Sequence, residues 1–93
     1  MRLNLYSIMD SKAKTYARPF LFQHDGEALR AFQGSVQKGD TQLSQFPEDF
    51  ILYKIGSFDD QSAEIASIKP VYVGKAVDYV KVRESVTGNG VQK

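Results

Sequence analysis

The chain has 93 residues, which is the size of one small domain, and its net charge is +1. With 42% hydrophobic and 25% charged residues it has the composition of a folded protein rather than a disordered one. The absence of cysteine excludes disulfides, thiolate catalysis and thiolate zinc sites. No apolar run approaches the length of about 18 residues that a membrane span needs, and the first residues do not resemble a signal segment, so we expect a cytosolic protein.

Charge is segregated along the sequence despite the low net value. Residues 1–24 contain four basic residues and one acidic residue, residues 39–68 contain six acidic and one basic, and residues 69–93 contain five basic and two acidic. Such asymmetry is typical of recognition through charged patches. If the fold mixes these signs in space, the same residues form an ordinary solvated surface.

Two strands are expected before the first helix. Residues 2–9 alternate in a way that predicts a strand with apolar side chains on both faces. Residues 15–23 predict a second strand after a polar loop. Pro19 cannot donate a ladder hydrogen bond, so this second strand should lie at an edge or be broken there. The side chains expected to share one side of it are Tyr16, Arg18, Phe20 and Phe22.

A short amphipathic helix that covers a sheet is expected over residues 25–37. Asp25 should accept hydrogen bonds from the free N–H groups of the first turn, and the helix dipole favours Glu27 nearby. Gly39 is well placed to end the helix. The apolar positions at helical spacing are Leu29, Phe32 and Val36.

The second half of the chain predicts a hairpin. Residues 41–49 are polar and contain a proline, so they should form a connection. Residues 50–58 alternate clearly and predict a third strand, residues 59–62 have the composition of a turn, and residues 63–69 complete the hairpin. Pro70 is expected to interrupt it.

Residues 73–83 predict a short second helix, although their β-branched residues also permit a strand. Residues 84–93 are rich in glycine and should form a flexible tail outside a single domain of residues 1–83. The fold class is therefore α+β, with a small, mostly antiparallel sheet of about four strands in the order β-β-α-β-β-α, covered by one or two helices.

Catalytic patterns are missing from the sequence. It has no glycine-rich phosphate loop, no HExxH pair and no nucleophile elbow. His24 is the only histidine, and a lone histidine before a helix is usually a surface or capping residue. The acidic pairs Glu48-Asp49 and Asp59-Asp60 lack the ligand spacing of a calcium loop. We expect no enzyme, no metal and no cofactor.

Cations alternate with aromatic residues in one segment, and this pattern suits single-stranded nucleic acid, because Lys and Arg pair with phosphates while bases stack on rings. The alternative is that the phenylalanines are core residues and Tyr16 and Arg18 lie at the rim. Tyr6 and Tyr53 carry the same ambiguity. The segment consists of Lys12, Lys14, Tyr16, Arg18, Phe20 and Phe22.

Three segments carry a resemblance to a known family: LNLYSIMDSKAKTY (3–16), DGEALRAF (25–32) and FPEDFILYKIGSFDD (46–60). They are similar to the small non-structural protein of gokushovirus-type microviruses, which are single-stranded DNA phages. The resemblance covers residues 2–83, and its most specific part is the segment 46–60. It implies an early phage protein of the host cytoplasm that binds DNA and acts in single-stranded genome synthesis or its coupling to packaging. It supplies no catalytic residues and no defined binding motif.

Two hypotheses follow. In the first, the protein binds single-stranded DNA without sequence preference: Lys12, Lys14 and Arg18 contact phosphates, Tyr16 and Tyr6 stack on bases, and Lys75, Lys81 and Arg83 extend the track. In the second, it is an adaptor that recruits or regulates replication or procapsid proteins through its acidic surface. In either case we expect a homo-oligomer, a dimer or higher, because apolar groups on both sheet faces exceed what one or two short helices cover.

Overall fold

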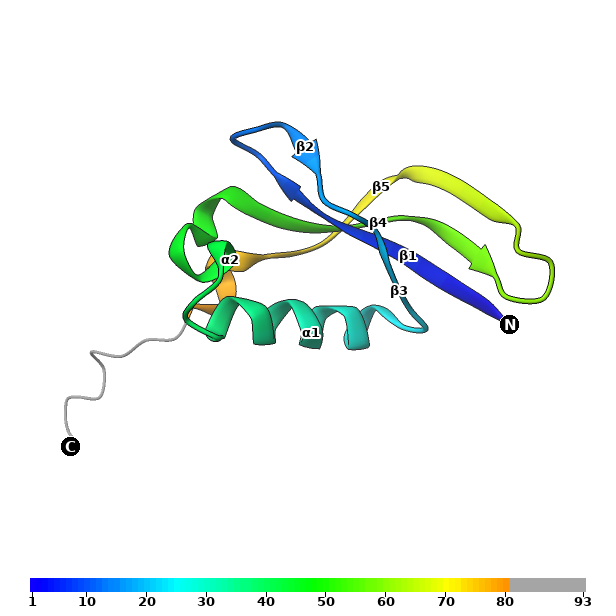
Figure 1. Ribbon diagram of the computed structural model, residues 1–93, viewed down its shortest axis with the longest axis horizontal. Coiled ribbons are helices and arrows are strands. Elements are labelled where there is room, and N and C mark those ends of the chain that lie inside the picture. Colours follow the sequence, from blue (N-terminus) through cyan, green and yellow to red (C-terminus); the bar gives the residue numbers. More distant parts are fainter. Residues whose placement is uncertain (81–93) are drawn as a thin grey trace.

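The computed structural model describes residues 1–80, in which helix α1 lies across one face of a twisted antiparallel sheet (Figure 1). This arrangement confirms the expected α+β class. The described elements are β1 (Arg2–Asp10), β2 (Thr15–Tyr16), β3 (Phe20–Phe22), α1 (Asp25–Gln37), α2 (Gln42–Gln45), the 3-10 turn η1 (Pro47–Asp49), β4 (Phe50–Asp59), β5 (Ile65–Lys75) and the 3-10 turn η2 (Ala76–Tyr79).

The sheet is built around β1 and β4, which pair along their whole lengths, from Arg2 opposite Asp59 to Asp10 opposite Phe50. The strand order is β2-β1-β4-β5, and β3 pairs with β1 on the same edge as β2. Every pairing is antiparallel. One sheet edge therefore consists of the two short strands β2 and β3, and β5 forms the other edge.

The predicted strand 15–23 is broken at Pro19, as expected, and its two pieces face opposite sides of the sheet. Met9 pairs with Tyr16 and Tyr6 pairs with Phe20, so β1 advances three residues while its partner advances four. One extra residue in the gap between β2 and β3 reverses the alternation. The prediction that Tyr16 shares a side with Phe20 and Phe22 is therefore wrong.

The prediction that Pro70 interrupts the hairpin is also wrong, because β5 continues through it. Lys54 pairs with Val71 and Gly56 pairs with Ser67, so two steps along β4 match four steps along β5. The surplus residues form a bulge around Pro70 on an edge strand, where the missing N–H of proline breaks no ladder hydrogen bond.

After Lys75 the chain forms the short 3-10 turn η2 rather than the second α-helix expected for residues 73–83. Residues 73–75 complete β5 instead. Residues 81–93, which include Lys81, Arg83 and the predicted tail, lie outside the described part of the chain.

Helix α1 has the predicted bounds, and its apolar side covers the sheet. Its N-cap residue is His24 rather than Asp25, and Gly39 ends the helix with a positive φ of 97°. Burial of each large apolar side chain between α1 and the sheet contributes about 1.5–3 kcal/mol. The buried core consists of Tyr6, Ala28, Phe32, Val36, Phe50, Leu52 and Ala76.

Candidate nucleic-acid interface

Three tyrosines form a row across the sheet face opposite α1, which we call the open face. They come from three strands: Tyr16 from β2, Tyr53 from β4 and Tyr72 from β5. The ring centroids of Tyr16 and Tyr53 are 6.0 Å apart, and those of Tyr53 and Tyr72 are 6.5 Å apart. Neighbouring rings meet edge-on, at interplanar angles of 62° and 80°. The rings therefore do not stack face to face on one another, which leaves π-faces free.

Strand register places the three rings on one face. Tyr53 lies opposite Ser7 on one side and Tyr72 on the other, and Tyr16 lies opposite Met9. Ser7 and Met9 are two residues apart on β1, so they share a face. The side chains of Tyr16 and Tyr72, on the two edge strands, are 47% and 52% exposed.

Lysines lie at both edges of this row. Lys75 pairs with Ile51 at the end of β5 and is exposed. Lys12 and Lys14 lie in the turn between β1 and β2, on the opposite edge and also exposed. The carboxylate of Asp10 holds this turn by accepting hydrogen bonds from the backbone N–H groups of Lys12 at 3.0 Å and Ala13 at 3.2 Å. Three strand spacings separate the two edges, a width of about 14 Å.

Four of the predicted site residues, Lys12, Lys14, Tyr16 and Lys75, therefore lie at one end of the open face. Arg18 is exposed in the gap between β2 and β3. The prediction that Tyr6 stacks on a base is wrong, because Tyr6 is 0% exposed and lies on the α1 side of the sheet. Its alternation with Leu5 and Ser7 turns it away from the open face.

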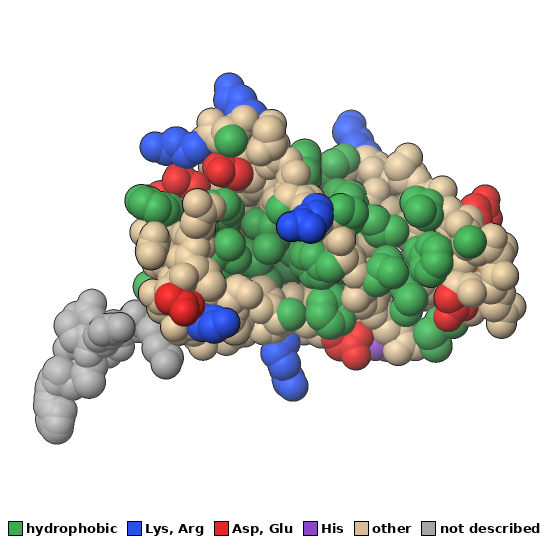
Figure 2. All heavy atoms as spheres, in the orientation of Figure 1, with side chains coloured by type: hydrophobic (Ala, Val, Ile, Leu, Met, Phe, Trp, Pro, Cys, Tyr) green, Lys and Arg blue, Asp and Glu red, His purple; other side chains and the backbone are tan. Residues whose placement is uncertain are grey.

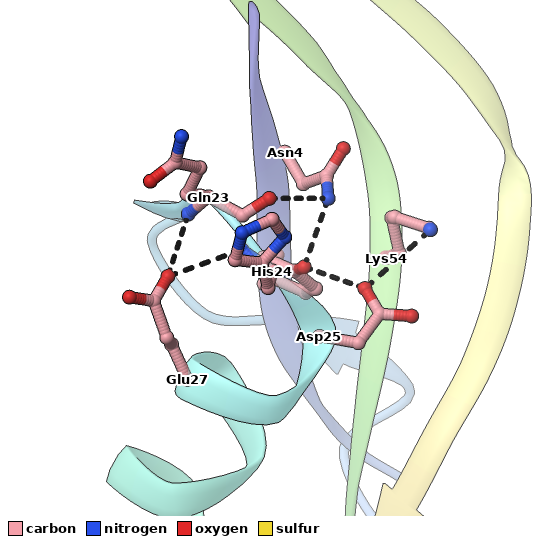
Figure 3. Close-up of polar contacts among 7 residues, drawn as sticks. Asn4, Gln23, His24, Asp25, Glu27 and Lys54 are labelled. Carbon is pink, nitrogen blue, oxygen red and sulfur yellow. Dashed lines mark hydrogen bonds and ion pairs between the residues drawn. The ribbon is translucent and has the colours of Figure 1, made fainter.

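Tyr6 instead belongs to a polar cluster that joins the first turn of α1 to the sheet. Its partners Asn4 and Asp25 are labelled in Figure 3. Its hydroxyl donates to Asp25 Oδ1 at 2.6 Å and accepts from the Asn4 side-chain amide at 3.2 Å. Lys54 Nζ lies 3.4 Å from the same Asp25 oxygen. Burial raises the pKa of Tyr6 to about 12, and the hydrogen bond to Asp25 acts in the same direction. Tyr6 therefore stays protonated and anchors the helix.

Glu27 completes the start of α1. Its Oε1 accepts hydrogen bonds from the backbone N–H groups of Gln23 and His24, each at 3.1 Å, as Figure 3 shows. These bonds satisfy donors that the helix itself leaves free. Asp25, predicted to do this, binds Tyr6 and Lys54 instead.

Carboxylates gather at the opposite end of the sheet from the lysines, in the turn between β4 and β5. Asp60 Oδ1 lies 2.7 Å from the N-terminal amine. Asp59 accepts from the N–H of Gln61 at 2.9 Å, and this bond lowers the pKa of its carboxyl below the ordinary value. Within residues 1–80, no three His, Asp or Glu side chains gather in a way that suits a metal ion. Charge thus varies along the open face instead of forming one continuous basic groove.

The family model for the Phage ORF5 protein matches residues 3–79 of the chain. The chain belongs to the Phage ORF5 protein family. The matched region includes the whole tyrosine row and both lysine-bearing edges. No curated protein and no solved structure matches. None of the helices in residues 1–80 combines the length and the apolar character that crossing a membrane requires.

Sequence reasoning missed Tyr72 in this ORF5-family protein. Because Pro70 was expected to end the strand, residues 71 and 72 were not predicted to be part of the sheet. An edge strand tolerates proline at a bulge, and beyond it Val71 pairs with Lys54 and Tyr72 with Tyr53. A further register shift lies between Tyr72 and Gly74, so alternation alone does not place Tyr72 beside Tyr53.

Proposed function

We propose that this phage protein binds single-stranded DNA on its open face. Its role is that of a non-structural protein in viral genome synthesis or its coupling to packaging, as the resemblance to gokushovirus-type microviruses suggests. The observation that supports DNA binding most strongly is the row of Tyr16, Tyr53 and Tyr72 on the sheet face that α1 leaves uncovered.

Exposed tyrosine rings suit single strands because every unpaired base presents a π-face. Stacking one base on an aromatic side chain contributes about 1–3 kcal/mol and depends little on sequence. The exposed rings of Tyr16 and Tyr72 lie on opposite sides of Tyr53, so a strand crossing the sheet meets them in succession. This geometry predicts binding with little base preference.

The electrostatic contribution is small in this proposal. Lys12, Lys14 and Lys75 offer three phosphate contacts, which corresponds to a slope of about −2 in log affinity against log salt. Such a shallow slope agrees with a net charge of only +1. Stacking, rather than counterion release, therefore supplies most of the specificity for single strands over duplex DNA, whose bases are already stacked.

A titration of the full chain with a thymidine oligonucleotide, at two salt concentrations, tests the proposal. The protein has five tyrosines and no tryptophan, so tyrosine emission reports directly on stacking. Tyr72→Ala should weaken binding by about 1–3 kcal/mol, or roughly 5- to 150-fold, whereas Tyr72→Phe should bind like the wild type.

Phe46→Ala is the matched control, because Phe46 is an aromatic residue with 51% exposure that lies outside the sheet. Its affinity should equal that of the wild type. If the wild type binds no oligonucleotide even at low salt, DNA binding is wrong. The adaptor hypothesis, with a protein partner at the acidic turn of Asp59, Asp60 and Glu64, then takes its place.

A further inference from the structure

A groove runs between α1 and β3, on a side of the molecule where hydrophobic side chains gather (Figure 2). It consists of two adjoining hollows of about 630 and 370 Å³, and Phe22 and Ala31 line both. Phe20 and Phe32 add further apolar surface to the smaller hollow. A contiguous apolar groove on a domain of this size is typical of an interaction site.

Nothing within residues 1–80 covers this groove on its outer side. Strand β3 pairs with β1 only, so its second edge has no strand partner in the described part of the chain. Such an edge, next to the half-buried phenylalanines Phe20 and Phe22, invites contact with another chain.

Glu27, Arg30 and Ala31 of α1 line the larger hollow. Lys38, the C-cap residue of α1, lies beyond both hollows at the other end of the helix. Glu27, Ala31, Gly34 and Lys38 follow one another at spacings of four, three and four residues, which places them along one side of a helix. No partner of opposite charge lies within ion-pair distance of Glu27 or Lys38 among residues 1–80. The space around Gly34 is open, since a Cβ there would meet nothing within 4 Å.

We propose that a second copy of the chain occupies this groove, with its α1 antiparallel to the first. This orientation places Glu27 of one copy opposite Lys38 of the other, and Ala31 opposite Gly34. A two-fold interface requires this kind of self-complementarity, in which each contact occurs twice. The small residues in the middle allow the helices to approach to about 8 Å, so that Phe20 and Phe22 of each copy are covered by the other.

This inference does not depend on the proposed DNA binding. Helix α1 lies on the sheet face opposite the tyrosine row, so the dimer leaves both open faces free. The alternative is a dimer whose contact lies on the open face. The two possibilities can be separated by substitutions on opposite faces.

Sedimentation equilibrium of the full chain at micromolar concentrations is the test. The wild type should have about twice the chain mass of 10.4 kDa. Ala31→Glu places a charge in the middle of the groove and should raise the dimer dissociation constant at least tenfold. Gln33→Glu adds the same charge on another side of α1, and Ile65→Glu adds it on the open face, so both should remain dimeric. Circular dichroism establishes that each variant is folded.

A change of charge at Lys38 tests the antiparallel orientation without disturbing the backbone contacts of Glu27 at the start of α1. Lys38→Glu places a carboxylate opposite Glu27 of the other copy at both symmetry-related contacts and should favour the monomer, whereas Lys38→Arg keeps the attraction and should remain dimeric. A wild type that stays monomeric at several hundred micromolar would overturn the proposal. So would a dimer that Ala31→Glu leaves intact, or one that only Ile65→Glu dissociates.

Discussion

The five tyrosines of the chain divide between the two faces of the sheet, and the two groups have different surroundings. Tyr6 and Tyr79 lie on the α1 side, where Tyr6 donates to Asp25 at 2.6 Å and the ring of Tyr79 packs 6.5 Å from that of Phe32. Tyr16, Tyr53 and Tyr72 lie on the open face, and no residue among 1–80 hydrogen-bonds to their hydroxyls. The first group holds the fold together, and the second is available to a ligand.

The largest expected contrast between the faces concerns stability. Leu52 is 0% exposed beneath α1, whereas Ile65 on the open face is 68% exposed. Leu52→Ala should lower the free energy of unfolding by about 2–5 kcal/mol, because it removes core contacts and leaves a cavity. Ile65→Ala should change it by no more than about 0.5 kcal/mol. Urea denaturation measures both, and a similar cost for the two variants would contradict the assignment of the core to the α1 side.

Two glycine positions should also differ in how much stability a substitution by alanine costs. A Cβ on Gly56 would collide with the backbone carbonyl oxygen of Ala66 on the neighbouring strand. A Cβ on Gly74 would lie 2.7 Å from Leu29 Cδ1, which is the end of a flexible side chain beneath α1. Gly56→Ala should therefore cost about 2–3 kcal/mol and Gly74→Ala about 1 kcal/mol. Thermal unfolding of the two variants shows which substitution costs more stability. A larger cost for Gly74→Ala would show that the Leu29 side chain is less able to move than the backbone of the neighbouring strand.

High pH should weaken the anchor on the α1 side selectively. The pKa of Tyr6 is raised to about 12 in the folded protein, from an ordinary value of 10, so its contribution is complete below pH 10 and declines as pH rises towards 12. At pH 11 the wild type should have lost about 1.4 kcal/mol from this residue. The variant Tyr6→Phe should not lose stability in this way, because phenylalanine has no hydroxyl that ionises.

The measurement is the difference in unfolding free energy between wild type and Tyr6→Phe at pH 9 and at pH 11. It should shrink by about 1.4 kcal/mol, while the other four tyrosines cancel because both proteins contain them. A difference that stays constant would show that the Tyr6 hydroxyl ionises as it does in the unfolded chain.

The smallest expected effect concerns the salt dependence of DNA binding on the open face. Replacing Lys12, Lys14 and Lys75 together with Ala should remove the slope of about −2 in log affinity for single-stranded DNA against log salt. Replacing Lys54, which pairs with Asp25 on the α1 side, should leave that slope unchanged. Fluorescence titrations across a salt series compare the two variants, and equal slopes would mean that the lysines at the sheet edges do not contact phosphate.

Local periodicity predicted the parts of the fold that depend on neighbouring residues. The alternation of Leu3, Leu5 and Ser7 with Asn4, Tyr6 and Ile8 is confirmed by the register of β1, and the bounds of α1 agree with its spacing of Phe32 and Val36. The turn at residues 59–62 also lies where its composition predicted.

The features that the sequence did not reveal depend on pairing between distant segments. The extra residue between Tyr16 and Phe20 is visible only from their partners on β1, and it moves Tyr16 to the other face from Phe20. The bulge around Pro70 likewise depends on β4. A second register shift on β5, between Tyr72 and Gly74, depends on β4 as well. Because these irregularities decide which tyrosines share the open face, the tyrosine row could not be assembled from the sequence, although Tyr16 and the lysines near it could be named.

Ring NMR signals of the five tyrosines, followed while a thymidine oligonucleotide is added to the full chain, test the division between the two faces most directly. Stacked bases shift the signals of rings that they cover. The signals of Tyr16, Tyr53 and Tyr72 should move as DNA is added, and those of Tyr6 and Tyr79 should stay in place. Movement of Tyr6 or Tyr79 without the other three, or no movement at any ring, would contradict the assignment of DNA binding to the open face.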